Sequence, residues 1–171
     1  SIHNTKNIKL SNIRFDQNHN FDDMLHVVYA SNVYLNNLIF NDANGDAIDI
    51  DMSRNILIEN SKFYNSNNDG IDLMESNVLI KNVKIFNSKD KAISIGEYSN
   101  AKIISSELKN NNIAVAVKDG SEVNIDKINF LYNSVQVSAY KKNLQYGDGG
   151  KANITNSNFV NEENNFSSKD S

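Results

Sequence analysis

Short stretches in which every second residue is apolar recur along the whole chain. In the clearest ones, two Asn residues five positions apart enclose two apolar positions, and another apolar residue follows three positions later. An alternation of period two is typical of a β-strand with one buried face. The copies are 22 to 29 residues apart, a spacing typical of solenoid repeats. Full copies start at Asn7, Asn32, Asn55 and Asn77, and weaker copies start at Asn100, Glu122 and Lys151.

Each repeat contains another alternating stretch, such as Ile48-Asp49-Ile50 or Ile71-Asp72-Leu73. No stretch shows a convincing helical period of 3.6 residues. Three short strands per turn of roughly 22 residues predict an all-β fold, a right-handed parallel β-helix of about seven coils. We expect residues 1–171 to form one domain. The inward column of these stretches is predicted to be Ile48, Ile71, Ile93, Val115 and Val135.

The composition sharpens this prediction. The chain of 171 residues has a net charge of −4 and contains no Pro, no Cys and no Trp, but 32 Asn. The lack of Cys excludes disulfides, Cys-based zinc sites and Cys nucleophiles. So much Asn is typical either of disorder or of a repeated structural role. The aliphatic columns argue against disorder, because a solvated tail would lack them.

Asn tolerates left-handed φ at bends, and stacked Asn residues can form amide ladders. We expect one ladder at Asn12, Asn37, Asn60 and Asn82, and a second at Asn65, Asn87 and Asn110.

Charge and hydropathy restrict the partners. The apolar runs are only a few residues long, so no membrane span is expected, and we expect no secretory leader within these residues. A mildly acidic chain without clustered Lys and Arg does not favour nucleic acid. The exposed edges of a β-helix need caps. Because no cap is evident, we expect a fragment of a longer chain, with residues 161–171 as a frayed polar tail.

One predicted strand of each coil has an unusual outer face. Its outward column is predicted to be His26, Asp49, Asp72, Ser94, Ala116 and Gln136. Asp46, Asp51 and Asp69 flank the same strands, so several carboxylates are expected to crowd together and repel. Ca²⁺ prefers such oxygen-rich clusters. The sequence thus predicts a Ca²⁺ site at Asp46, Asp49, Asp69 and Asp72. The alternative is a solvated acidic face that aids solubility.

Basic and aromatic residues are expected beside these acids. They are Lys91, Lys118, Lys141 and Lys142, with Tyr98, Tyr140 and Tyr146. Tyr rings can stack on sugar rings, and lysines can pair with uronate carboxylates. This combination favours a polysaccharide, which we expect to contact Tyr98, Tyr140, Lys141 and Lys142.

The coil pattern resembles the pectate-lyase-like right-handed β-helix superfamily. Within it, the run from Asn68 to Leu73 is similar to the calcium-binding segment of family nine pectate lyases. The resemblance implies Asp46, Asp69 and Asp72 as Ca²⁺ ligands, although Asn68 replaces an Asp. It also implies a Lys base on the next coil, where this chain has Ser94, which lacks the required basicity. Lys91 or Lys118 would have to act as the catalytic base of a polysaccharide lyase.

A second resemblance concerns large bacterial surface proteins. The segments 90–97, 118–121 and 139–142 are similar to β-helix modules joined there to spore-coat-kinase-like (CotH) or lamin-tail-like domains. This similarity implies a secreted or cell-surface bacterial location. It also favours a competing hypothesis, a non-catalytic structural or adhesion spacer. Self-assembly through uncapped ends is a third hypothesis.

The chain also contains an outward apolar stripe. Tyr34, Leu57 and Leu79 are expected at equivalent positions of three successive coils. Stacked apolar residues that face outward usually contact something. We therefore expect this stripe to contact a partner or a neighbouring domain.

Overall fold

The computed structural model describes residues 1–19 and 21–161, and these residues form 21 β-strands and no helix. They accordingly contain no helix long and apolar enough to cross a membrane. Three parallel sheets of seven strands each are present. Sheet A consists of β1 (Ile2–His3), β4 (Leu25–Val28), β7 (Ile48–Asp51), β10 (Ile71–Met74), β13 (Lys91–Gly96), β16 (Ile113–Lys118) and β19 (Val135–Tyr140). Sheet B consists of β2 (Lys6–Ser11), β5 (Ser31–Asn36), β8 (Arg54–Glu59), β11 (Asn77–Lys81), β14 (Asn100–Ile104), β17 (Glu122–Asp126) and β20 (Lys151–Thr155). Sheet C consists of β3 (Arg14–Asp16), β6 (Ile39–Asn41), β9 (Lys62–Tyr64), β12 (Lys84–Phe86), β15 (Glu107–Lys109), β18 (Asn129–Leu131) and β21 (Asn158–Val160).

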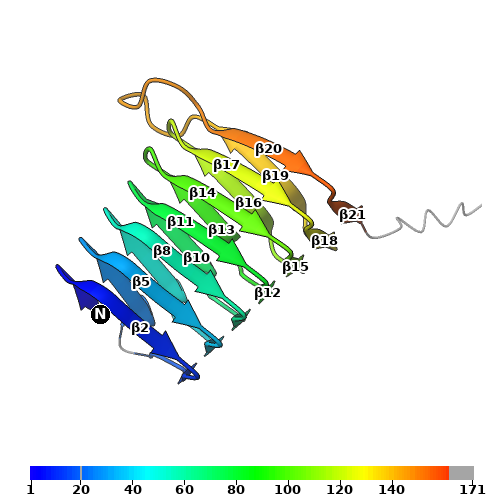
Figure 1. Ribbon diagram of the computed structural model, residues 1–171. Coiled ribbons are helices and arrows are strands. Elements are labelled where there is room, and N and C mark those ends of the chain that lie inside the picture. The colour runs from blue at the N-terminus through cyan, green and yellow to red at the C-terminus, as the bar shows by residue number, and fades with distance from the viewer. Residues whose placement is uncertain (20, 162–171) are drawn as a thin grey trace, which may run out of the picture.

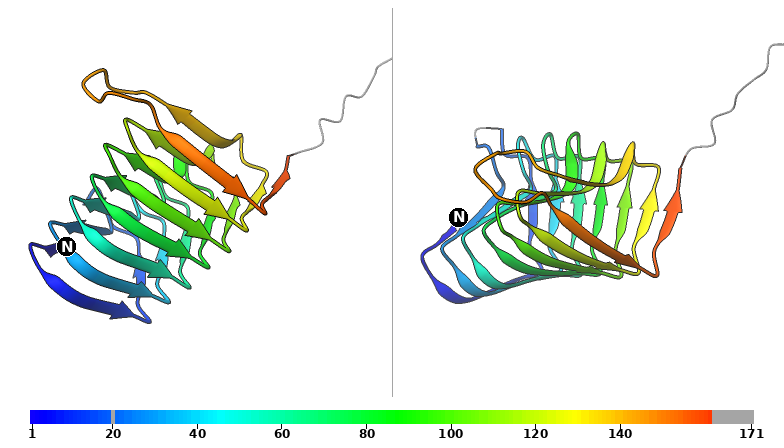
Figure 2. Two further views of the ribbon diagram at one scale, coloured as in Figure 1. Left: turned by 45° about the horizontal axis from the view of Figure 1, so that its top comes forward. Right: turned by 90° about the horizontal axis from the view of Figure 1, so that it is seen from above.

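The chain visits sheets A, B and C in turn and then starts the next coil, so each strand pairs with the equivalent strand one coil away. The strands of sheet B therefore lie side by side in chain order (Figure 1). The coils stack from the N-terminal to the C-terminal end in every view (Figure 2). Seven strands per sheet correspond to about six turns from the first strand to the last. The prediction of a parallel β-helix with three strands per coil is confirmed.

The core is a set of columns that run along the solenoid axis. In sheet A, Ile48, Ile71, Ile93 and Val115 stack in register, and none of them is exposed. In sheet C, Phe40 is sandwiched between Phe15 and Phe63, with ring centroids 4.6 and 5.0 Å apart. Parallel coils place equivalent residues above one another at about 4.8 Å, so one apolar position per repeat becomes a continuous apolar column.

The last coil of sheet A differs from the sequence prediction by two residues. Val137, not Val135, stacks on Val115, and Ser138, not Gln136, stacks on Ala116. Val135 instead pairs with Ile113 and is 41% exposed. The stretch from 134 to 139 alternates throughout, so its pattern alone fits either register. The pairing of whole strands selects one.

The Asn residues occupy the bends, as predicted. Asn12, Asn37, Asn60 and Asn82 all have φ between 51° and 60°. The Nδ2 of Asn37 donates to Oδ1 of Asn12 at 2.7 Å, and that of Asn82 to Asn60 at 2.7 Å. The column is interrupted between Asn37 and Asn60, because Nδ2 of Asn60 donates to Oδ1 of Asn36 at 2.8 Å instead of to Asn37. In the second predicted column, Asn87 donates to Asn65 at 2.9 Å. No hydrogen bond joins Asn110 to Asn87 in the part of the chain that the structure describes.

A buried Ser column supports the bends between sheets A and B, and the sequence pattern did not reveal it. The backbone N–H of Ser53 donates to Oγ of Ser76, the N–H of Ser76 to Oγ of Ser99, and the N–H of Ser99 to Oγ of Ser121. All four residues are buried. Each hydroxyl therefore satisfies a backbone donor that the bend removes from the strand ladders.

The C-terminal coil is less well covered than the middle of the solenoid. Ile154 and Phe159, on β20 and β21, are 39% and 49% exposed. The loop between β19 and β20 projects beyond the other bends (Figure 1). The predicted tail 161–171 lies, apart from Asn161, outside the described residues.

Candidate functional site

The candidate site lies on the outer face of sheet A. Its central column is His26, Asp49, Asp72, Ser94, Ala116 and Ser138, in strand-to-strand register. One column further along the strands come Val28, Asp51, Met74, Gly96, Lys118 and Tyr140. The face changes along the axis from acidic on the early coils to small residues and then to Lys and Tyr.

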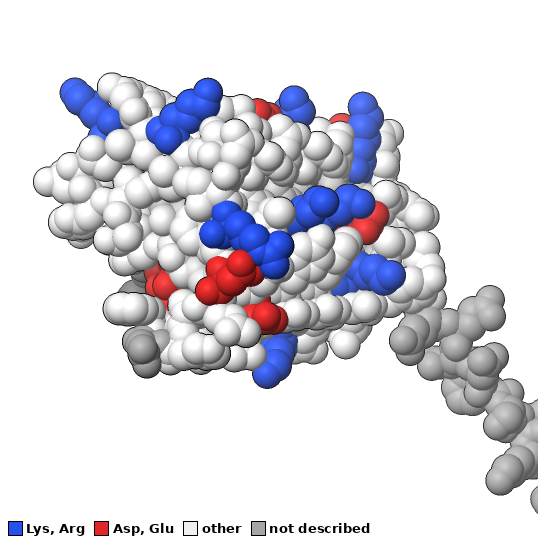
Figure 3. Space-filling view, turned by 90° about the horizontal axis from the view of Figure 1, so that it is seen from below, with Lys and Arg blue, Asp and Glu red and all other residues white. Residues whose placement is uncertain are grey.

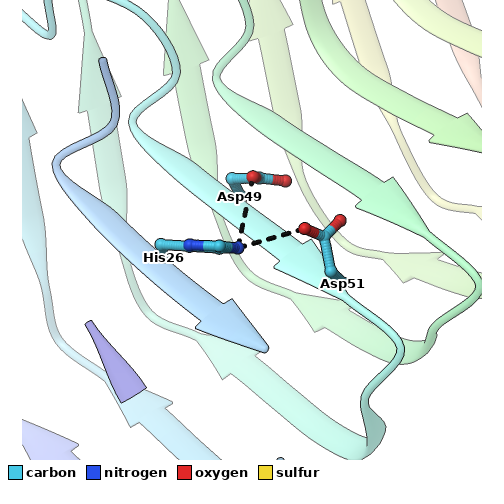
Figure 4. Close-up of side chains that lie close together, drawn as sticks. All are labelled: His26, Asp49 and Asp51. Carbon is cyan, nitrogen blue, oxygen red and sulfur yellow. Dashed lines mark hydrogen bonds and ion pairs between the residues drawn. The ribbon is translucent and has the colours of Figure 1, made fainter. Parts of the chain in front are cut away.

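Three side chains converge at the acidic end. Nε2 of His26 lies 3.0 Å from Oδ2 of Asp51 and 3.6 Å from Oδ2 of Asp49 (Figure 4). His26 projects from β4, and both carboxylates project from β7. Parallel pairing sets His26 directly opposite Asp49 and Val28 opposite Asp51. The sequence placed all three residues on this face but did not identify His26 and Asp51 as ligands. The contact between the imidazole and the carboxylate depends on the register of β4 and β7, which the sequence alone does not give.

Asp46 and Asp69 have a different role at the bend that precedes each strand. Oδ1 of Asp46 accepts from the backbone N–H of Asp69 at 2.7 Å and from Nδ2 of Asn68 at 2.8 Å. Oδ1 of Asp69 accepts from the backbone N–H of Lys91 at 2.8 Å. These two acids thus link each bend to the next coil.

Burial and mutual repulsion perturb these acids. Burial, followed by the charges of Asp51 and Asp23, raises the pKa of Asp49 to about 7. Burial and the nearby carboxylates also raise the pKa of Asp46 to about 7, although the backbone N–H of Asp69 opposes this rise. The pKa of Asp69 rises to about 6 because burial outweighs the charge of Lys91. Removal from water disfavours the charged form of each carboxyl group.

The four predicted Ca²⁺ ligands do not form one coordination sphere in this geometry. Among residues 1–19 and 21–161, His26, Asp49 and Asp51 are the only three His or acidic residues whose ligand atoms all lie within 4.8 Å of one another. Asp46 and Asp69 already accept backbone donors. The residues as arranged therefore do not fit a Ca²⁺ ion bound jointly by Asp46, Asp49, Asp69 and Asp72.

Lys91 belongs to an ion-pair group beside Asp69. Its Nζ lies 3.4 Å from Oδ1 of Asp69 and also contacts Asp90. Burial lowers the pKa of Lys91, but the hydrogen bond to Asp90 and the charge of Asp69 more than compensate, so the pKa is raised. An ammonium that stays protonated and is already paired with two carboxylates is not suited to removing a proton.

Lys118 lies across the sheet on the next coil. A Cβ on Gly96 would come within 2.5 Å of Cε of Lys118, so the glycine makes room for the lysine stem. Lys118 is only 6% exposed. Burial raises the pKa of the half-buried Glu97, and the charge of Lys118 offsets part of that rise. Ser94 is fully buried.

The predicted sugar-binding residues lie toward the C-terminal end of the solenoid. Tyr98 is in the bend after β13, Tyr140 ends β19, and Lys141 and Lys142 begin the loop that follows. Tyr98 is 58% exposed, and its ring lies over Gly120, where a Cβ would be 2.6 Å away. Tyr140 pairs with Lys118 across β16 and β19. Oδ1 of the buried Asp119 accepts the backbone N–H groups of Lys142 and Asn143, each at 2.8 Å. This contact fixes the start of the loop that carries Lys141, whose Nζ donates to the Gly147 carbonyl.

The family comparison agrees with this architecture. A family model described as "right handed beta helix region" matches residues 23–169. The chain belongs to the right-handed β-helix family. No curated protein matches the chain in a sequence search. Membership of this family specifies the fold, but it does not specify what the residues of the candidate site do.

This β-helix has other surfaces that differ in character from sheet A. A polar groove of about 950 Å³ follows the bend from sheet C to sheet A and is lined by residues such as Asn65, Asn87 and Tyr132. On sheet B, Tyr34, Leu57 and Leu79 stack in register as predicted, all half-buried. The face seen from below carries acidic and basic side chains next to one another (Figure 3).

Proposed function

We propose that this β-helix module binds an acidic polysaccharide across the outer face of sheet A. Lys118 supplies positive charge on β16, and Tyr98 and Tyr140 supply aromatic surface. The ammonium of Lys91 is already paired with Asp69 and Asp90, so it contributes less. The observation that carries the proposal is the gathering of Lys118, Tyr98 and Tyr140 at one end of this face. Gly96 leaves space for the Lys118 stem, and Gly120 leaves space for the Tyr98 ring. The pairing of β16 with β19 sets Tyr140 beside Lys118.

The chemistry favours uronate-containing chains. A uronate carboxylate gains a charge-assisted hydrogen bond from an ammonium group. The low exposure of Lys118 strengthens that bond, because a partly buried pair is screened less by salt than a surface pair. Lys141 and Lys142, both exposed on the loop between β19 and β20, extend the positive surface beyond the sheet. The parent protein of such a module would be a secreted or cell-surface bacterial protein.

The proposal concerns binding first and catalysis second. If the module also cleaves its ligand by β-elimination, Lys118 is a better base than Lys91, whose raised pKa and ion pairs keep it protonated. A non-catalytic spacer is the competing function. The continuous ladders and buried columns of a stiff solenoid support it.

Calorimetric titration with polygalacturonate, alginate and neutral dextran tests the proposal. We expect binding of at least one uronate polymer and none of dextran. Lys118→Ala should weaken binding about tenfold or more, because it removes a charge-assisted hydrogen bond. Lys62→Ala, an exposed lysine on sheet C, is the matched control. Absorbance of unsaturated products reports any lyase activity. Absence of binding to all three polymers would favour the spacer.

A further inference from the structure

We propose that His26, Asp49 and Asp51 form a binding site for a divalent transition metal of the Zn²⁺ type. This site shares only Asp49 with the Ca²⁺ cluster that the sequence suggests, and it does not depend on polysaccharide binding. One imidazole nitrogen and two carboxylate oxygens face a common point, with their ligand atoms within 4.8 Å of one another. Figure 4 shows both Asp side chains directed toward the ring nitrogen of His26.

The scaffold holds these donors in place. Leu25 and Val27 alternate with His26 along β4, and Ile48 and Ile50 alternate with the two acids along β7. These four aliphatic side chains are buried in the core. Because inward packing fixes both strands, the outward donors are arranged before any ion arrives, which is the main requirement for a metal site on a rigid element.

The hydrogen bonding of the carboxylates distinguishes them from the other acids of the face. Within the described part of the chain, the one hydrogen bond to either carboxylate joins Asp51 to His26. Asp49 accepts none from these residues and lies 3.6 Å from the His26 ring nitrogen. By contrast, Asp46 and Asp69 accept backbone N–H groups. Yet the side chains of Asp49 and Asp51 are only 21% and 17% exposed. Two adjacent carboxylates that are shielded from water and short of donors are suited to a cation.

The donor set selects the class of metal. Ca²⁺ and Mg²⁺ prefer oxygen ligands alone, whereas imidazole suits Zn²⁺ and its first-row neighbours. Two carboxylates and one neutral imidazole are three protein ligands. The His26 side chain, 37% exposed, leaves the outward side accessible to water or another ligand. Binding requires His26 to be neutral, so it displaces any proton that the imidazole carries.

Calorimetry and thermal unfolding of the chelator-treated protein test this site, with ZnCl₂, CoCl₂ and CaCl₂ as probes. We expect one Zn²⁺ per chain and a higher Tm with Zn²⁺ than with Ca²⁺ at equal concentration. Co²⁺ should give an absorption spectrum in the visible range. His26→Asn and Asp51→Asn should each weaken Zn²⁺ binding at least tenfold. His3→Asn, an exposed His on β1, should bind like the unaltered chain.

Two controls keep the outcomes separable. Circular dichroism of each variant without metal verifies that the β-helix is intact, and Asp51→Glu retains a carboxylate and should keep part of the affinity. The proposal is overturned if Zn²⁺ neither binds nor raises the Tm. It is also overturned if His26→Asn binds Zn²⁺ as tightly as the unaltered chain, or if Ca²⁺ binds more tightly than Zn²⁺. In those cases the cluster is an ion pair or an oxygen-only site.

Discussion

At the scale of single residues, the outer face of sheet A combines three kinds of acidic side chain. Asp46 and Asp69 hold bends together, Asp49 and Asp51 face His26, and Asp90 pairs with Lys91. All of them look alike in the sequence. Their different environments decide which acid caps a backbone, which is available to a cation and which neutralises a lysine.

The raised pKa values predict that stability falls as pH rises. Asp46 and Asp49 have pKa values of about 7 in the folded chain, against 3.8 for an unperturbed Asp. Between these limits the folded state binds more protons than the unfolded state, so the free energy of unfolding decreases with pH. We expect a loss on the order of 1–2 kcal/mol between pH 4.5 and 8, below the nominal 1.4 kcal/mol per pKa unit because solvent screens part of the effect.

Urea unfolding at pH 4.5, 6 and 8, with chelator present, measures this loss. Asp49→Asn cannot ionise at this position and should flatten the profile. A free energy of unfolding that increases steadily over this range would contradict the prediction.

At the scale of the elements, the bends depend on hydrogen bonds between equivalent side chains of successive coils. Asn columns occupy the outside of several bends with positive φ, and the Ser column lies inside the bend between sheets A and B. A polar bend inside a solenoid is stable only when its backbone donors find partners, because each buried unsatisfied group is costly. Repetition supplies the partner from the next coil.

Ser76→Ala tests the buried Ser column. It removes the acceptor for the N–H of Ser53 and a hydroxyl that donates to the Met74 carbonyl. We expect a loss of about 1–3 kcal/mol, the cost of leaving a buried donor unpaired. Ser134→Ala, at an exposed bend, is the control and should change stability by less than about 0.5 kcal/mol. Equal effects of the two substitutions in urea unfolding would argue against a supporting role for the column.

At the scale of the whole molecule, each coil is supported only by its neighbours, as in other repeat proteins. Among residues 1–19 and 21–161, the middle coils pair with a coil on each side, while the strands of the C-terminal coil pair with one neighbouring coil. Phe63 is fully buried, whereas Phe159, at the equivalent position of the last coil, is 49% exposed. The same residue type therefore contributes differently according to its distance from the end.

Phe63→Ala and Phe159→Ala form a matched pair of substitutions. Phe63→Ala opens a cavity next to Phe40 and should lower the free energy of unfolding by about 3–5 kcal/mol. Phe159→Ala should cost less than half as much, since its ring is 49% exposed and stacks on Phe130 on one side. Urea denaturation followed by circular dichroism measures both. Similar losses would mean that the last coil is as well packed as the middle.

The repeat alone determined most of the fold. Alternating positions identified the three strands of each coil, the inward columns and the Asn bends, because a parallel solenoid repeats one local pattern and stacks it in place. The pattern failed at β19, where alternation extends too far to specify register and the pairing with β16 selects Val137 and Ser138. It also missed the Ser column, since Ser is common at exposed bends as well as buried ones.

Less of the candidate site could be predicted from the sequence. The register confirms the predicted outward column from His26 to Ala116, but the sequence did not reveal which partners these side chains have. Only the tertiary structure decided that His26 meets Asp49 and Asp51, that Asp46 and Asp69 accept backbone donors, and that Gly96 makes room for Lys118. The physical reason is that apolar burial follows a local period. Hydrogen bonds and ion pairs instead need side chains more than twenty positions apart to be placed correctly to within a few tenths of an ångström.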